Sequence, residues 1–447
     1  MAKQLFGTDG IRGIPGVDPL DDATLFATGR ALGVCLLAEH GAPRVMIGMD
    51  TRESGPHIAA VLAAGLAAGG ASASFAGVIT TPGVACLVRQ EDFRAGVVIS
   101  ASHNPFQDNG IKLFSHAGMK FDDAFEEKLE TEILRLRSAP APENPPLLVA
   151  DETLDADYLA FLRTRLLPGA SLAGLRIVLD CAHGAAYKLG PGLFRSLGAN
   201  VIAINVSPDG RNINAGCGSL HLEGLQQRVV QEKAALGIAF DGDADRALFV
   251  TATGRVVNGD GVLLAAARYL KSEGLLKGER VVATTMSNLG LERVLAAEGI
   301  SLARAGVGDR YVLEEMLRGG NALGGEQSGH IIFLEDSPAG DGLLTALKIA
   351  SLVALRGPLE ELIQGFQEYP QKIVNVKVRS KPPLETLPAV AAALAEANSA
   401  LGANGRIVLR YSGTEKLARV MVEAEHEADV LRFSESVAAA LRSAIGA

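Results

Sequence analysis

The chain has 447 residues, of which 48% are hydrophobic and 21% are charged, and it contains 51 glycines. At about 150 residues per domain this length predicts several domains, and the apolar content excludes a disordered chain or a fibrous repeat. The net charge of −9 gives no electrostatic reason to expect nucleic acid or an anionic membrane as a partner, so an anionic ligand would need a local basic site.

Cysteine usage and the N-terminal residues indicate a cytoplasmic protein. The chain has neither a C-x-x-C pair nor zinc-type spacing among its four cysteines, which are Cys35, Cys86, Cys181 and Cys217. The N-terminal residues lack the apolar run of a secretory signal peptide.

The first part of the chain alternates short apolar runs with helical patterns. Residues 58–79 carry no charge, but their small side chains and the Gly69-Gly70 break predict a helix over 56–68 and a strand over 73–78 rather than a membrane span. With strands at 45–47 and 97–99, this βαβ alternation predicts mainly parallel sheet covered by helices.

An amphipathic helix and a proline-rich connector end this first domain. The helix is predicted from the spacing of Phe125, Leu129, Ile133 and Leu136. Four prolines among residues 138–146 cannot continue it, so we expect a domain boundary near residue 150.

The same alternation then resumes and predicts two more α/β domains, which divide near residue 253. The expected strands are 177–179, 201–204, 238–240 and 281–284, and the expected helices are 185–197, 222–235, 259–273, 289–298, 309–318 and 341–354.

From Tyr369 onward the pattern changes to strands with one buried face. Val374, Val376 and Val378 alternate with polar residues. Further elements are expected as a helix near 387–401, strands at 406–410 and 418–423, and a last helix carrying Val430, Phe433, Val437 and Leu441. The predicted fold class is therefore α/β, with three similar mixed α/β domains (1–150, 151–253 and 254–367) and a smaller C-terminal α+β domain (368–447).

Three carboxylates follow the strand that is predicted to end at Phe240. Asp241, Asp243 and Asp245 stand at i, i+2 and i+4, and in an extended loop they can converge on one hard divalent cation. An EF-hand is excluded because Arg246 stands where its glycine would be, and Asp245 breaks the haloacid-dehalogenase-type phosphatase motif. The alternative is a solvated acidic turn, which is disfavoured because uncompensated carboxylates repel one another.

A hydroxyl beside an imidazole occurs at the end of another predicted buried strand. The run Ile99 to Pro105 lies where α/β sheets place ligand-contacting loops, and it offers a possible nucleophile or phosphate acceptor. Local chemistry does not choose between Ser100 and Ser102, and Ser-His next to proline can also be a simple turn.

Two more polar loops follow predicted strands. Residues 324–330 offer a carboxylate, an amide and a hydroxyl, which suit the hydroxyls of a sugar. Residues 410–416, with hydroxyls, a glycine backbone and the guanidinium of Arg410 or Arg419, suit a phosphate group. Either loop alone could be a surface turn. The absence of a Gly-Lys dipeptide excludes a P-loop for ATP.

Five motifs occur in order over residues 6–423 and together resemble the α-D-phosphohexomutase family. They are residues 6–13, 101–105, 241–246, 325–330 and 410–415. The resemblance implies four domains around a central cleft, each contributing one loop. It implies an isomerase whose partner is a small-molecule hexosamine phosphate, interconverting glucosamine 6-phosphate and glucosamine 1-phosphate through a phosphoserine and a sugar bisphosphate.

The resemblance also assigns residues. Ser102 would carry the phosphoryl group, and with it Asp241, Asp243 and Asp245 would hold one Mg²⁺ per chain. Sugar hydroxyls would be bound by Glu326 and Ser328, and the non-reacting phosphate by Arg410, Ser412, Gly413, Thr414 and Arg419. Residues that match positions linked to phosphoryl and proton transfer are Arg12, His103, Lys112 and His330, with the general acid and base left open.

Several alternatives stay open. For Lys112, the alternating run 111–114 also fits a solvent-facing strand lysine. For the whole protein, the alternatives are a family member acting on mannose or glucose phosphates, a phosphatase that releases the phosphoryl group to water, and a non-catalytic sugar-phosphate binder. Both a monomer and a homodimer are compatible with the sequence. Tyr411 and Lys416 depart from the family pattern and make the edge of the phosphate loop less typical.

Overall fold

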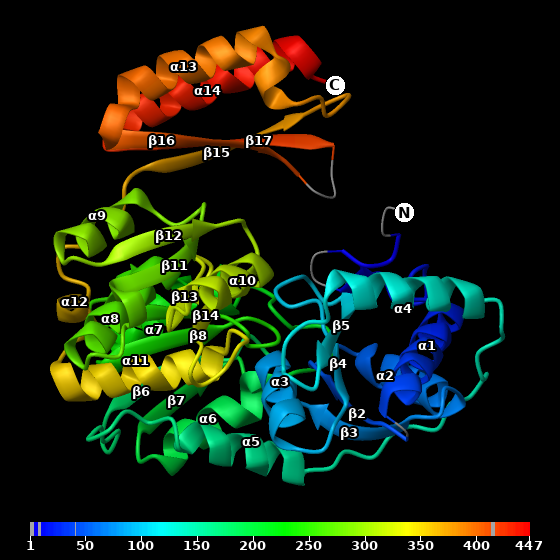
Figure 1. Ribbon diagram of the computed structural model, residues 1–447. Coiled ribbons are helices and arrows are strands. Elements are labelled where there is room, and N and C mark those ends of the chain that lie inside the picture. The colour runs from blue at the N-terminus through cyan, green and yellow to red at the C-terminus, as the bar shows by residue number, and fades with distance from the viewer. Residues whose placement is uncertain (1–3, 8–9, 41, 413–415) are drawn as a thin grey trace. The chain divides into compact units, whose positions relative to one another are not determined.

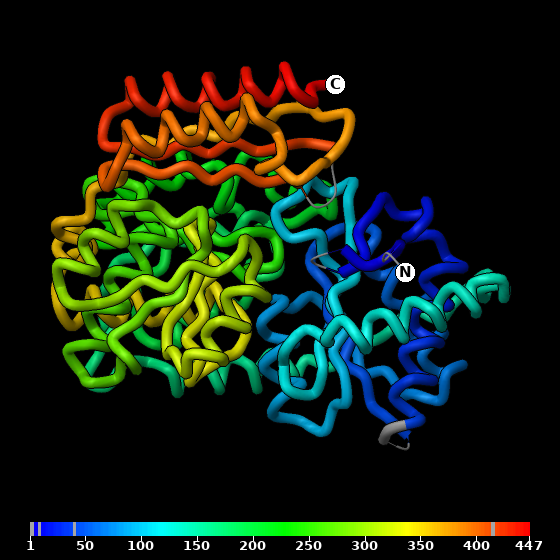
Figure 2. The backbone as a smooth tube through the Cα atoms, turned by 45° about the horizontal axis from the view of Figure 1, so that its top comes forward, coloured from blue at the N-terminus to red at the C-terminus, as the bar shows by residue number. Residues whose placement is uncertain are grey.

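The computed structural model describes residues 4–7, 10–40, 42–412 and 416–447. The described chain forms two compact units, traced in Figures 1 and 2. The large unit comprises Met1–Thr284 and Ala305–Gln364, and the small unit comprises Thr285–Arg304 and Gly365–Ala447.

The large unit begins with a five-stranded sheet in the order β1-β5-β4-β2-β3. Its strands are β1 (Ile11–Gly13), β2 (Arg44–Met49), β3 (Ser72–Val78), β4 (Ala95–Ile99) and β5 (Asn109–Ser115). Strands β2, β3 and β4 are parallel, whereas β5 and β1 are antiparallel. Every residue of β4 is buried, as expected for an apolar strand that helices cover on both faces.

Four helices cover this sheet. They are α1 (Asp22–His40), α2 (Gly55–Ala68), α3 (Thr81–Gln90) and α4 (Asp123–Leu136). The patterns above do not predict α1. Its Gly29 lies so close to α2 that a Cβ atom there would be 2.2 Å from the carbonyl oxygen of Leu62, and a Cβ atom on Gly65 of α2 would be 2.3 Å from that of Phe26. Glycine on both helices therefore permits their close packing.

The second sheet of the large unit has the order β10-β9-β8-β6-β7. Its strands are β6 (Arg176–Asp180), β7 (Asn200–Ile204), β8 (Leu236–Phe240), β9 (Ala247–Thr251) and β10 (Val256–Val257). Again β6, β7 and β8 are parallel and the last two are antiparallel. The helices of this part are α5 (Thr153–Arg163), α6 (Ala186–Ser196) and α7 (Glu223–Glu232).

A third set of strands completes the large unit. Strand β11 (Arg280–Thr284) is parallel to β13 (Leu323–Gly325), which pairs antiparallel with β14 (Ile331–Phe333). Its helices are α8 (Gly259–Ser272), α10 (Asp309–Gly319), α11 (Gly342–Arg356) and α12 (Leu359–Leu362).

The small unit is an antiparallel sheet covered by two helices. Its strands have the order β15-β17-β16 and are β15 (Gln371–Lys377), β16 (Gly405–Tyr411) and β17 (Leu417–Ala424). Helices α13 (Pro388–Leu401) and α14 (Glu427–Ile445) lie side by side over one face, as Figures 1 and 2 show. The unit also contains α9 (Leu289–Ala297) and most of β12 (Ser301–Ala305).

The predicted fold class is confirmed, with one difference in the sheets. In β15, Val376 is buried between exposed Asn375 and Lys377, as the alternation predicts. The first sheets are less parallel than expected, because β4, β8 and β13 each return through a polar loop as an antiparallel strand. None of the described helices combines the length and apolar character that a membrane crossing requires.

Candidate active site

The loop after β4 directs Ser102 toward the acidic loop, residues 241–246, which follows β8. Ser102 is 1% exposed and has a left-handed backbone with φ of 52°. Its Oγ donates a hydrogen bond to Asp241 Oδ2 at 2.6 Å, and it lies 3.4 Å from His103 Nδ1. These two loops therefore meet at a buried serine hydroxyl.

Ser100 has a different place in this loop. Its Oγ accepts a hydrogen bond from the Ser102 amide at 2.9 Å and donates one to Asp50 Oδ2 at 2.5 Å. The hydroxyl of Ser100 is thus engaged in holding the backbone of Ser102, whereas that of Ser102 faces the acidic loop. Between the two serines, this geometry favours Ser102 as the nucleophile.

Two further side chains hold the carbonyl side of Ser102. Arg52, which is fully buried and paired with Asp50, donates through Nη2 to Ser102 O at 3.2 Å and to Asn104 O at 2.6 Å. Asn214 Nδ2 donates to the same two carbonyls at 2.9 and 3.0 Å. A positive φ is uncommon for a serine, and these contacts on both sides of the residue stabilise it.

Gly242 permits the close approach of the two loops. A Cβ atom at this position would lie 2.5 Å from the carbonyl oxygen of Ser102 and 2.9 Å from Asn214 Nδ2. A glycine is therefore needed between Asp241 and Asp243, because any side chain there would clash with the backbone of Ser102.

The three carboxylates converge as the sequence predicts. One oxygen from each of Asp241, Asp243 and Asp245 lies within 4.8 Å of the other two. Over the described residues, Oδ1 of Asp243 and Oδ1 of Asp245 are buried without a hydrogen-bond partner. Two such oxygens, in an all-oxygen set, fit Mg²⁺, which prefers carboxylate ligands and leaves positions for a phosphate oxygen.

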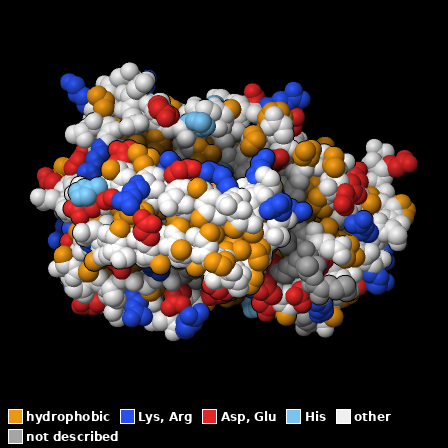
Figure 3. All heavy atoms as spheres, turned by 90° about the horizontal axis from the view of Figure 1, so that it is seen from above, with side chains coloured by type: hydrophobic (Ala, Val, Ile, Leu, Met, Phe, Trp, Pro, Cys, Tyr) orange, Lys and Arg blue, Asp and Glu red, His pale blue; other side chains and the backbone are white. Residues whose placement is uncertain are grey.

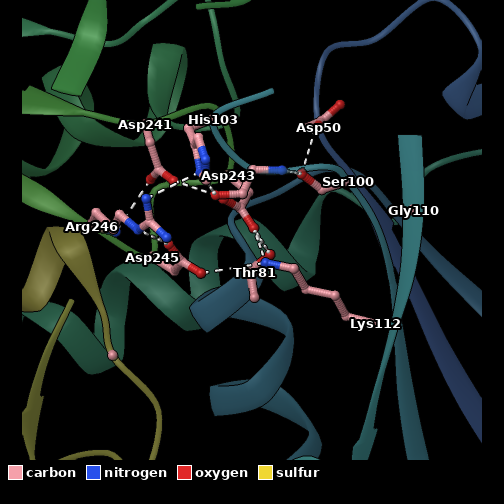
Figure 4. A network of polar contacts seen from close by, with 12 residues as sticks. Asp50, Thr81, Ser100, His103, Gly110, Lys112, Asp241, Asp243, Asp245 and Arg246 are labelled. Carbon is pink, nitrogen blue, oxygen red and sulfur yellow. Dashed lines mark hydrogen bonds and ion pairs between the residues drawn. The ribbon is translucent and has the colours of Figure 1, made fainter. Parts of the chain in front are cut away.

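Lys112 of β5 is buried against these carboxylates. Its Nζ lies 2.7 Å from Asp243 Oδ2 and 3.3 Å from Asp245 Oδ2, and its side chain is 2% exposed. Figure 4 shows it extending from β5 to the acidic loop. The alternative of a solvent-facing lysine is wrong, because the loop after β8 covers this face of the strand.

The pKa values of Asp241 and Asp245 are shifted in opposite directions. Burial, with Asp245 and Asp243 nearby, raises the pKa of Asp241 well above its ordinary value. Burial also acts on Asp245, but Lys112 and His330 hold its pKa well below the ordinary value. Part of the raised pKa of Asp241 comes from the neighbouring carboxylates, and a divalent cation would offset that repulsion.

His103 is held as a neutral base. Burial, followed by the charges of Arg246 and Arg12, lowers its pKa to about 4. Arg246 Nη1 lies 3.1 Å from His103 Nδ1, and a guanidinium only donates, so Nδ1 accepts and the ring proton is on Nε2. Arg12 reaches this region across Gly110, where a Cβ atom would be 3.1 Å from Arg12 Cγ.

The loop after β13 carries the residues predicted to bind sugar. Glu326 Oε1 accepts from the Gly308 amide at 3.0 Å, and Oε2 accepts from Ser328 Oγ at 3.1 Å. His330 is 6% exposed, and its Nδ1 lies 3.9 Å from Asp245 Oδ2. Its Nε2 lies 3.2 Å from the Gly340 amide nitrogen, and although burial opposes the charged ring, Asp245, Asp309 and Glu326 raise the pKa of His330 to about 9.

The predicted phosphate residues are in the small unit. Arg410 and Arg419 are directly opposite one another on β16 and β17. Burial, and then the charge of Arg419, lowers the pKa of Arg410. Ser412 is 4% exposed, whereas Gly413 and Thr414 lie outside the described residues. Like charges opposite one another repel, and an anion between them would relieve the repulsion.

Sequence reasoning missed several residues of the site. Asp50 and Arg52 follow β2, which neighbours β4, so a polar pair at the end of a buried strand was an available signal. Thr81 and Asn214 contact the site from distant segments, and no local pattern marks them.

Comparisons with known proteins agree along the whole chain. Family models match in order as phosphoglucomutase/phosphomannomutase alpha/beta/alpha domain I (residues 3–139), domain II (156–254), domain III (258–369) and C-terminal domain (373–440). The phosphoglucosamine mutase of Solibacter usitatus is 53% identical over 447 residues and is matched over 100% of both chains.

Solved structures share the fold at low identity. A phosphoglucomutase/phosphomannomutase family protein from Burkholderia thailandensis superposes with a TM-score of 0.80 at 22% identity, over 99% of this chain and 98% of that one. The N-acetylphosphoglucosamine mutase of Aspergillus fumigatus, solved in complex with GlcNAc-6P and magnesium, gives a TM-score of 0.62 at 18% identity, over 99% and 96% of the two chains.

Proposed function

Because the chain belongs to the phosphoglucomutase/phosphomannomutase family, we propose that it interconverts glucosamine 6-phosphate and glucosamine 1-phosphate. The family expected from the five motifs is confirmed, and so is the prediction of an isomerase. The choice of sugar rests on one observation: this chain is 53% identical over its full length to a phosphoglucosamine mutase. The buried Ser102 beside three carboxylates supplies the chemistry that such a reaction needs.

The proposed phosphoryl donor is Ser102 in its phosphorylated form. Transfer breaks the bond between phosphorus and Ser102 Oγ and forms one between phosphorus and the free hydroxyl oxygen of the bound monophosphate. That hydroxyl loses its proton, and the serine oxygen regains one. The resulting sugar bisphosphate turns end for end and returns its other phosphoryl group to Ser102, so the enzyme is regenerated.

The proposed metal site is formed by Asp241, Asp243 and Asp245 together with the phosphorylated Ser102. Mg²⁺, when bound, would neutralise charge on the transferred phosphoryl group. The contacts of Ser100, Arg52 and Asn214 support this assignment, because they fix the backbone from which Ser102 reaches the carboxylates. Positioning of this kind supplies much of the rate in phosphoryl transfer.

The remaining residues are assigned to binding and proton transfer. Glu326 and Ser328 would bind the sugar, in a loop that His330 links to the acidic loop. Arg12, Lys112, His103 and His330 are candidates for steadying the transferred group or moving protons. The non-reacting phosphate would be bound by Arg410, Ser412, Gly413, Thr414 and Arg419.

One experiment separates this mutase from a phosphatase that uses the same serine. Purified enzyme is given glucosamine 1-phosphate and Mg²⁺, with and without glucosamine 1,6-bisphosphate, while glucosamine 6-phosphate and inorganic phosphate are both measured. We expect the bisphosphate to stimulate formation of the 6-phosphate, with little inorganic phosphate released. Phosphate release in step with substrate loss would contradict the proposal.

A further inference from the structure

Thr81 contacts the acidic loop although it is distant from it in sequence. It is the first residue of α3, and its Oγ1 donates to Asp243 Oδ2 at 2.6 Å. Its amide also donates to the Asp243 carbonyl at 3.0 Å. Both residues are buried, and Figure 4 shows Thr81 directed at Asp243. The helix start is thus joined to the acidic loop by two hydrogen bonds.

The hydroxyl of Thr81 is not needed to cap its own helix. Thr80 is the N-cap residue of α3, and its Oγ1 accepts from the Gly83 amide at 3.1 Å. Of two adjacent threonines, one therefore stabilises the helix start in the usual way, and the other is left to hold a carboxylate.

The contact decides which oxygen of Asp243 remains available. Oδ2 accepts from both Thr81 and Lys112, whereas Oδ1 is buried and has no hydrogen-bond partner within the described part of the chain. Rotation of the carboxylate would expose Oδ2 to the cation only by breaking both bonds. Lys112 is a candidate for contacting the transferred phosphoryl group, which leaves Thr81 as the partner dedicated to this carboxylate.

We propose that Thr81 is a positioning residue that orients Asp243 so that Oδ1 binds the magnesium ion. The role rests on the magnesium site proposed above. Groups that hydrogen-bond to metal ligands fix their orientation, and their loss typically weakens metal binding about 10- to 100-fold.

The test is Thr81→Val, which keeps the shape of the side chain and replaces the hydroxyl with a methyl group. Mg²⁺ binding to the full chain is measured by isothermal titration calorimetry, and turnover is followed as a function of Mg²⁺ concentration. We expect Kd for Mg²⁺ to rise about tenfold to a hundredfold. Turnover of the variant should recover at high Mg²⁺, which a general folding defect would not allow.

Two further variants make the result specific to the hydroxyl. Thr81→Ser retains the donor and should bind Mg²⁺ within about threefold of wild type, since the hydrogen bond to the ligand is preserved. Thr28→Val is the matched control, because Thr28 is a buried threonine of α1 whose Oγ1 bonds the Thr24 carbonyl at 2.8 Å, away from the acidic loop. It should leave Kd unchanged.

Three results would overturn the proposal. If wild type binds Mg²⁺ and Thr81→Val binds it equally well, Thr81 has no such role. Equal weakening in Thr81→Ser would assign the effect to packing of the methyl group. If wild type itself binds no Mg²⁺ while Asp243→Asn behaves identically, the magnesium site fails, and the role of Thr81 fails with it.

Discussion

The serine site of the large unit and the arginine pair of the small unit differ in how their charged groups are arranged. Near Ser102 three carboxylates converge, and Lys112 from another segment supplies the opposite charge by contacting Asp243. Arg410 and Arg419 instead face one another on adjacent strands with the same charge. Figure 3 shows acidic and basic side chains interspersed on the face that it presents.

The difference matches what the two regions are proposed to do. A reacting group needs a fixed geometry, which buried and mutually paired charges provide. A phosphate-binding site must bind and release either end of a bisphosphate, and two adjacent cations are suited to that. The predictions below test this contrast, beginning with the largest expected effect.

Removing the nucleophile should abolish catalysis. We expect Ser102→Ala to reduce kcat below about 10⁻⁴ of wild type, because removal of a covalent nucleophile leaves only binding and electrostatic effects. Peptide mass analysis of active enzyme should find phosphate on Ser102. Ser100→Ala should be less damaging, because that hydroxyl only supports the backbone. Phosphate on Ser100 alone would reverse the assignment.

Removing the buried ammonium group of Lys112 should destabilise the large unit and make its stability depend on Mg²⁺. Lys112→Met leaves Asp243 and Asp245 without this partner, and breaking a buried ion pair costs about 3–5 kcal/mol of unfolding free energy. Mg²⁺ should restore part of that loss by binding only the folded state. Urea unfolding with and without Mg²⁺ measures both effects.

Lys277→Met is the control for this variant. Lys277 pairs with Glu335 at the surface, where both side chains are more than half exposed, so the change should be about 0.5 kcal/mol or less. A stability loss in Lys112→Met no greater than in this control would show that the buried contact is unimportant.

Neutralising one of the paired arginines should affect binding rather than chemistry. Arg419→Gln should raise KM about tenfold to a hundredfold, since a hydrogen bond to a charged group is worth about 1.5–3 kcal/mol. Arg432→Gln, at an exposed pair with Glu396, is the control. A fall in kcat at unchanged KM would instead indicate that Arg419 acts in phosphoryl transfer.

The sugar should be discriminated more weakly than the phosphate. We expect kcat/KM for glucosamine 1-phosphate to exceed that for glucose 1-phosphate and mannose 1-phosphate by about tenfold or more, or about 1.4 kcal/mol. Kinetics on the three sugars, each with its own bisphosphate, provide the measurement. A higher value for glucose or mannose would move the protein to another branch of the family while leaving the serine chemistry intact.

The smallest effect concerns His103 and pH. Its pKa of about 4 lies below the ordinary value of 6.5, so the folded protein resists a proton that the unfolded chain accepts. The contribution of His103 to stability therefore declines as pH falls from about 6.5 to 4 and is constant below that range. Nitrogen NMR of the imidazole should show the proton on Nε2 and a midpoint near 4. A midpoint at or above 6.5 would contradict the contact with Arg246.

Much of the fold and part of the site follow from the sequence alone. Apolar periodicity predicts most strands and helices, and the spacing of Asp241, Asp243 and Asp245 is a local property of one loop, so its convergence could be predicted. The order of the five motifs identifies the family. Helix α1 was missed because it packs against two other helices, α2 and α4, so its buried residues do not form the single apolar stripe that such predictions use.

Only the tertiary structure decided how the loops meet. Alternation in β5 leaves a solvent-facing Lys112 possible, and Lys112 is buried because a loop from the second sheet covers that face of the strand. The contacts of Arg52, Thr81 and Asn214 join residues at least 50 positions apart in sequence. Such contacts depend on the packing of whole domains, and no periodicity within a single segment encodes them.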